Sequence, residues 1–180
     1  MDRFRAIAPE ELENVFRLVG KDWMLITAKG KNGNGDDVIN TMTASWGGMG
    51  VLWNKPVAFC FIRPQRYTHA LTEQSERFSL SFFSEEYRGA LRLCGTKSGR
   101  EIDKFAATGL TPTTVENTPY VKEARLVLIC RKLYADTLKA ASFLDPALLE
   151  NYKDGDFHTV YVAEIEKALF LSTSADQIAK

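Results

Sequence analysis

The sequence predicts a mainly β fold, a closed or nearly closed antiparallel barrel with peripheral helices. Three observations support this. Short apolar runs rich in aromatic and β-branched residues recur along the chain, separated by Gly, Asn and Asp turns. In residues 78–82, Phe and Leu alternate with Ser, as in a strand with one apolar face. No Pro- or Gly-rich linker divides the chain, so we expect a single domain over residues 1–180.

The strands predicted from these runs number about seven. Between the first two, the segment KGKNGNGDD supplies Gly and Asn residues that a long hairpin loop can use at positive φ. The run at 57–62 lies between two prolines and is short, which favours a buried strand. The clearest strand runs are 23–28, 40–46, 57–62, 78–82, 125–131 and 158–165.

Helices are predicted where apolar residues recur at helical spacing. One helix begins near Thr68 and reaches Gln74. Ser84 is a candidate cap for a second helix that stops at Gly95. Ser98 and Glu101 have the spacing of a capping box, which predicts a third short helix that ends near Gly109. A further helical piece follows Asp145 and Pro146.

Composition excludes several classes of protein. The 23 Lys and Arg balance the 23 Asp and Glu, and no dense basic cluster occurs, so nucleic-acid binding is not expected. No apolar run is long enough to span a bilayer, and the charged start lacks a secretory signal, so we expect a cytoplasmic protein without a membrane segment. Three cysteines in no metal-binding or CxxC pattern favour buried free thiols over a redox or metal role.

Two segments suggest a ligand site. In NTMTASW, residues 40–46, small side chains would let a flat ligand approach the backbone, whose N–H and C=O groups can bond its polar edge; the alternative is a Thr-rich edge strand. Arg63, Arg66 and Thr68 lie at a predicted helix start, an arrangement that suits a phosphate. Exposed arginines on a turn are the alternative. Around a second predicted helix start lie Ser98, Gly99, Arg100 and Lys104.

Together these segments resemble the flavin reductase-like family of FMN-binding split barrels, of the flavoredoxin type. The resemblance rests on NTMTASWGGMGVLWNKP, IRPQRYT, FSLSFF, CGTKSGREIDKF and DGDFHTVYVAEI, in that order and over most of the chain. It implies a six-stranded Greek-key split barrel that works as a homodimer with FMN at the subunit interface. It also implies an electron acceptor that is either a partner protein or free flavin.

The resemblance also implies cofactor-binding roles for individual residues. The isoalloxazine would be lined by residues of the first segment, the ribityl chain would continue along the second, and the phosphate would meet residues from the second and fourth. Ser81, on the hydroxyl-bearing face of its strand, is a weaker candidate. The residues are Asn40, Met42, Thr43, Ala44, Ser45 and Trp46 for the ring, Ile62 and Arg63 for the ribityl chain, and Arg66, Tyr67, Thr68, Ser98 and Lys104 for the phosphate.

His158 follows an Asp-Gly-Asp turn at the start of a predicted strand. In related flavin reductases a histidine at a similar place lies near the flavin, so the resemblance makes His158 a candidate catalytic residue; a structural hydrogen bond is the alternative. NADH or NADPH would then be the transient electron donor. No GxGxxG motif follows a strand, so no Rossmann site is indicated. The alternatives are an FMN electron carrier without NAD(P)H activity and a flavin-free barrel used for binding.

Overall fold

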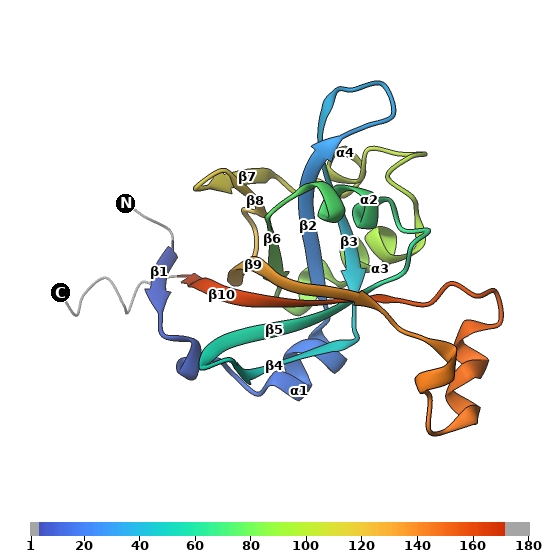
Figure 1. Ribbon diagram of the computed structural model, residues 1–180. Helices are drawn as coiled ribbons and strands as arrows, with labels where there is room; N and C mark the ends of the chain where they lie inside the picture. The colour runs from blue at the N-terminus through green and yellow to red at the C-terminus, as the bar shows by residue number, and fades with distance from the viewer. Residues whose placement is uncertain (1–3, 172–180) are drawn as a thin grey trace.

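The computed structural model describes residues 4–171 (Figure 1). Within this range an antiparallel sheet curls around one core, and helices lie outside it, so the predicted fold class is confirmed. The strands are β1 (Phe4–Ile7), β2 (Met24–Lys31), β3 (Asp37–Ala44), β4 (Gly47–Leu52), β5 (Lys55–Ile62), β6 (Arg77–Phe82), β7 (Pro112–Val115), β8 (Thr118–Val121), β9 (Leu126–Thr137) and β10 (Thr159–Leu171).

The main sheet has the order β3-β2-β6-β9-β10-β5-β4, with β1 added to the far end of β10. β2 and β3 pair without a shift from Met24↔Ala44 to Lys31↔Asp37, as the predicted hairpin requires. β5 pairs with β10 so that Ile62 lies opposite Thr159. The ends of β3 and β5 and the start of β10 therefore come together at one end of the barrel.

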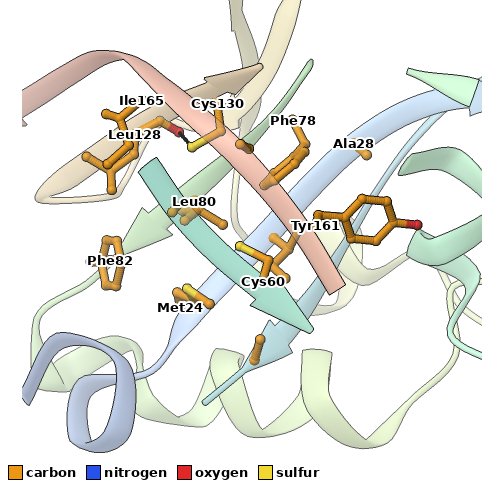
Figure 2. Close-up of a cluster of buried hydrophobic side chains, with 14 of the residues drawn as sticks. Met24, Ala28, Cys60, Phe78, Leu80, Phe82, Leu128, Cys130, Tyr161 and Ile165 are labelled. Atoms are coloured by element: carbon orange, nitrogen blue, oxygen red, sulfur yellow. Dashed lines mark hydrogen bonds between the residues drawn. The ribbon is translucent and has the colours of Figure 1, made fainter. Parts of the chain in front are cut away.

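The barrel core is built largely from alternate residues of six strands, β2, β3, β5, β6, β9 and β10, and Figure 2 shows a number of these side chains converging. Both faces of β2, β6 and β9 are buried, because a second cluster of apolar side chains lies between these strands and the elements outside them. Thr27, Ser79 and Ser81 face this outer layer and are fully buried. The labelled core residues are Met24, Ala28, Cys60, Phe78, Leu80, Phe82, Leu128, Cys130, Tyr161 and Ile165.

The helices are α1 (Val15–Arg17), α2 (Tyr67–Gln74), α3 (Arg88–Thr96) and α4 (Lys104–Thr108), and α2 and α3 pack beside β2 and β3. Short 3-10 turns lie at Pro9–Glu11, Glu85–Tyr87, Ala140–Ser142 and Pro146–Tyr152, and a π turn lies at Leu18–Asp22. The α2 prediction is confirmed within one residue. Asp145 caps the 3-10 turn that begins at Pro146, as predicted.

The predicted end of α3 is confirmed within one residue, but the predicted start of the next helix is wrong. α3 ends at Thr96, one residue beyond Gly95. The box of Ser98 and Glu101 caps no helix: residues 98–102 form turns, and α4 begins later because the Asp103 carboxylate accepts the N–H groups of Phe105 and Ala106. Gly109 does end α4, at a φ of 71°.

The connection between β9 and β10, residues 138–158, forms an arm that extends from the barrel, drawn in orange in Figure 1. Its aromatic residues pack on one another, with Tyr152 stacked on Phe157 and Phe143 against both. Asp156 joins the arm to the barrel through an ion pair with Arg63 and a 2.6 Å hydrogen bond from Gln65. The arm thereby forms one wall at the end of the barrel described above.

The three cysteine thiols are buried and free, as predicted. Burial raises the pKa of the Cys60 thiol to about 12. Among residues 4–171 no helix is long and apolar enough to cross a membrane. Over the same range, no group of three His, Cys, Asp or Glu side chains could hold a metal ion.

Candidate functional site

Two neighbouring hollows lie where the ends of β3 and β5 meet the start of β10. The first, the strand-end hollow, has a volume of about 180 Å³. Its wall includes the segment from the end of β3 through the turn into β4, where Gly47 has a φ of 152° and an added Cβ would lie 2.4 Å from the Phe59 carbonyl oxygen. The hollow is lined by Met42, Thr43, Ala44, Ser45, Trp46, Phe61, Arg63, Arg66 and His158.

The second hollow, the helix-end hollow, lies between the start of α2 and the end of α3 and has a volume of about 200 Å³. Arg66, the residue before α2, lines both hollows, so they are adjacent. The helix-end hollow is lined by Gln65, Arg66, Tyr67, Thr68, Gly95, Thr96, Lys97, Ser98, Gly99 and Lys104. The tertiary structure thus brings together the two sequence segments that were predicted to share a phosphate.

Besides the exposed Lys97, the helix-end hollow contains a buried cation, Lys104, and a half-buried one, Arg66, and neither has a carboxylate partner among residues 4–171. The ammonium of Lys104, 3% exposed, donates to the carbonyl oxygens of Thr41 at 2.8 Å and Cys94 at 2.9 Å. Arg66 donates to the same Cys94 oxygen at 3.2 Å. Burial, together with the positive charge of Arg66, lowers the pKa of Lys104 to about 8. A bound anion would offset the free-energy cost of burying these positive charges.

The side chain of Asn40 contacts both segments of the helix-end hollow, the start of α2 and the turn at Gly99. Its amide nitrogen donates to the Thr68 hydroxyl at 2.9 Å, and both side chains are buried. Its amide oxygen lies beside Gly99, where an added Cβ would come within 2.1 Å. Gly99 is therefore required because the backbone passes close to Asn40. Asn40, which was predicted to line the ring, lines neither hollow; its side chain instead contacts Thr68 and Gly99, which line the helix-end hollow.

The other two arginines of the predicted site have different surroundings. Arg63 pairs with Asp156, donates to the Asn151 carbonyl oxygen at 2.9 Å and lies over the ring of Tyr152. Arg100 lies over the ring of Tyr67 and donates to the Gln65 carbonyl oxygen at 3.1 Å. Because Arg63 has a carboxylate partner, it contributes less free positive charge to the hollows than Arg66 does.

His158 lines the strand-end hollow and is 7% exposed. Its Nδ1 lies 2.9 Å from the hydroxyl of Tyr152, and its ring lies 5.3 Å from that of Trp46, centroid to centroid. Burial lowers the pKa of His158 to about 4, helped by the charge of Arg63. The imidazole is therefore neutral near pH 7.

Two predicted site residues lie elsewhere and are corrected. The side chain of Ile62 is fully buried in the barrel core, because the alternation of β5 turns its neighbour Phe61 toward the hollow instead. Ser81 is fully buried under β8, where its hydroxyl accepts from the Val121 N–H at 3.5 Å. Its face of β6 carries hydroxyls, as predicted, but a second apolar layer covers that face.

Within the hollows, some predicted side chains are already engaged. The Thr43 hydroxyl donates to the Leu91 carbonyl oxygen of α3, so only the backbone of Thr43 is available to a ligand in the hollow. The Ser98 hydroxyl accepts from the N–H of Arg100 at 3.2 Å. Sequence reasoning missed Phe61, which strand alternation relative to Ile62 would have identified, and Gln65, for which no sequence signal exists.

The donor set fits a ligand with a flat ring and an anionic end. The strand-end hollow offers small residues, aromatic edges and a neutral imidazole. The helix-end hollow offers two unbalanced cations, a threonine hydroxyl and the first turn of α2, which together suit a phosphate. FMN, which the sequence resemblance implies, has both parts, and the residues present fit it.

Comparisons with known proteins agree with this geometry. The family model described as flavin reductase like domain matches residues 16–177. A comparison with curated proteins gives no match. Among solved structures, an FMN-binding protein from Thermus thermophilus is 22% identical over 93% of this chain and 79% of its own, with a TM-score of 0.63. Flavoredoxin of Desulfovibrio vulgaris is 23% identical over 84% and 70%, with a TM-score of 0.62.

The styrene monooxygenase flavin reductase from Pseudomonas putida S12 is more distant, at 14% identity over 82% of this chain and 78% of its own, with a TM-score of 0.56. At these identities the three structures establish the fold alone. A solved structure with a split barrel domain, from Shewanella frigidimarina, is 18% identical over 93% of this chain and 78% of its own, with a TM-score of 0.62, and the split-barrel prediction is confirmed.

Proposed function

Because this chain belongs to the flavin reductase-like domain family, which its match over residues 16–177 establishes, we propose that it binds FMN across the two hollows and passes electrons from NADH or NADPH through that flavin. The phosphate would lie in the helix-end hollow and the isoalloxazine in the strand-end hollow. The acceptor would be free flavin or a partner protein.

The observation that carries the proposal is the pair Arg66 and Lys104. Burying two cations without a carboxylate costs free energy, which a permanent anionic ligand would recover. Arg66 lines both hollows, so a ligand whose phosphate binds Arg66 can extend the rest of its length into the strand-end hollow. A ligand that extends from a phosphate to a flat ring matches this order of surfaces.

Each group of residues has a role in this proposal. Arg66, Lys104, Thr68 and the N–H groups of the first turn of α2 bind the phosphate. The backbone of 42–46 bonds the polar edge of the ring, and Trp46 shields it from water. FMN, when bound, supplies the electron chemistry by accepting a hydride from a reduced nicotinamide. His158 supplies a neutral hydrogen-bond donor beside the ring, for the flavin or for the nicotinamide.

We also propose that the chain works as a homodimer with FMN at the interface. The strand-end hollow, which would hold the ring, has a volume of only about 180 Å³, and Trp46 in its wall is 48% exposed, so one protomer would leave the ring partly uncovered. α1 contacts β4, and exposed apolar side chains gather there: Phe16 is 90% exposed, Val51 78% and Trp53 56%. A second copy that covers this surface would remove it from water.

The test begins with the visible spectrum of the purified protein, reconstituted with FMN if colourless, and continues with anaerobic addition of NADH or NADPH. The proposal predicts a flavin spectrum that bleaches with at least one donor. A protein that binds FMN but is reduced by neither donor would be an electron carrier for a protein partner. A protein that takes up no FMN would overturn the cofactor assignment.

A further inference from the structure

The phenol of Tyr152 comes from the arm, and its hydroxyl contacts His158, which lines the strand-end hollow. Tyr152 ends the 3-10 turn Pro146–Tyr152 and is 9% exposed. Its hydroxyl lies 2.9 Å from Nδ1 of His158, and the two rings are nearly perpendicular, at 89°. The mechanism proposed above uses His158 but gives no role to Tyr152.

The position of this phenol is fixed from several sides. Its ring stacks on Phe157 at 4.8 Å between centroids with an interplanar angle of 15°, and Phe143 lies against its edge at 5.6 Å. The guanidinium of Arg63 lies 5.1 Å from its centroid, and that guanidinium is itself anchored by Asp156. A ring held in this way presents its hydroxyl in one place.

The direction of the hydrogen bond follows from the available acceptors. Burial raises the pKa of the Tyr152 phenol, so it keeps its proton. Among residues 4–171, the hydrogen bonds of its oxygen include only the one to Nδ1. The phenol proton therefore has Nδ1 as its protein acceptor, and an unprotonated Nδ1 in a neutral imidazole leaves the proton on Nε2.

We propose that Tyr152 is a positioning residue that holds His158 in the tautomer with its proton on Nε2, so that the N–H is free to donate into the strand-end hollow. No hydrogen bond within residues 4–171 engages Nε2, and the ring of His158 lines the hollow. This inference rests on the proposed function for its catalytic meaning, but the tautomer is a property of the protein without its cofactor.

The test is a long-range ¹H–¹⁵N spectrum of protein with ¹⁵N-labelled histidine, recorded near pH 7 with and without FMN. The chain has only two histidines. His69, whose Nε2 lies 2.9 Å from the Thr159 hydroxyl, serves as internal reference. For His158 we expect an unprotonated Nδ1 and a protonated Nε2. In Tyr152→Phe, which keeps the aromatic stack, the His158 nitrogen shifts should move toward an average of both tautomers while those of His69 stay.

Kinetics provide a second readout. Tyr152→Phe should lower the rate of flavin reduction about fivefold, which corresponds to the free energy of one hydrogen bond. Its FMN affinity should stay within about twofold of the wild type. The matched control is Tyr134→Phe, which removes an exposed hydroxyl on β9. A wild-type His158 protonated on Nδ1, or identical His158 shifts in Tyr152→Phe, would overturn the inference. If the nitrogen shifts behave as expected but neither nicotinamide reduces the flavin, the proposed reductase function fails and the tautomer assignment stands.

Discussion

Arg66 and Lys104 donate to the same carbonyl oxygen, that of Cys94 in the last turn of α3, at 3.2 Å and 2.9 Å. The two cations come from different segments, one before α2 and one at the start of α4. The negative end of the α3 dipole helps to hold them together. Because the end of α3 carries only a partial negative charge, the pair keeps a net positive charge, which can bind an anion.

Replacement of Arg66 by Ala should weaken FMN binding by about 2–3 kcal/mol, because a charge-assisted contact to the phosphate is lost. Fluorescence titration of the flavin measures this. Riboflavin, which lacks the phosphate, should bind the variant and the wild type alike. Arg92→Ala, an exposed arginine on α3, is the matched control and should leave both affinities unchanged. Equal FMN affinity in Arg66→Ala would remove this residue from the phosphate site.

FMN affinity should decrease as the pH rises above about 8. In the free protein burial lowers the pKa of Lys104 to about 8, and a bound phosphate raises it again. Between these two pKa values binding takes up a proton, so the affinity falls by up to about tenfold per pH unit. Titrations from pH 7 to 10 measure the slope. Lys104→Met should bind FMN more weakly at pH 7 and show a flatter profile, whereas an unchanged slope in this variant would assign the pH dependence to another group.

Gly99→Ala should weaken FMN binding about tenfold, since the added Cβ lies 2.1 Å from the Asn40 amide oxygen and must displace it. Displacement breaks the hydrogen bond from Asn40 to Thr68, worth about 1 kcal/mol, and shifts the start of α2. Gly33→Ala, which places a Cβ in open space, is the control. Isothermal titration and thermal unfolding together check the prediction, which fails if the two variants bind FMN equally.

Val51→Asp should shift the protein from dimer to monomer, because a carboxylate would be buried in the proposed interface. Light scattering at micromolar concentration measures the mass. Val51 is 78% exposed in the protomer, so the variant should fold normally. Leu144→Asp, on the arm and 99% exposed, serves as control and should not change the mass. A wild-type monomer, or a Val51→Asp dimer, would refute the proposed surface.

Local signals were sufficient for much of the fold. The hairpin of β2 and β3, the buried run of β5, and helix α2 follow from patterns within ten or twenty residues. Local signals failed where contacts between residues distant in sequence decided the structure instead. Ser98 and Glu101 have the spacing of a capping box, yet Asp103 caps α4, because the backbone at 98–102 turns to pass Asn40 instead of forming a helix.

For the site, the sequence by itself determined the residue types: small residues on β3, arginines before α2, and a lysine after the SGR segment. Only the tertiary structure decided which charges are free. It paired Arg63 with Asp156 from the arm, left Arg66 and Lys104 without a carboxylate partner in the described part of the chain, and buried Ser81 under β8. The physical reason is that charge balance and burial are set by neighbours from distant parts of the chain, 93 residues apart for Arg63 and Asp156, which local sequence patterns do not encode.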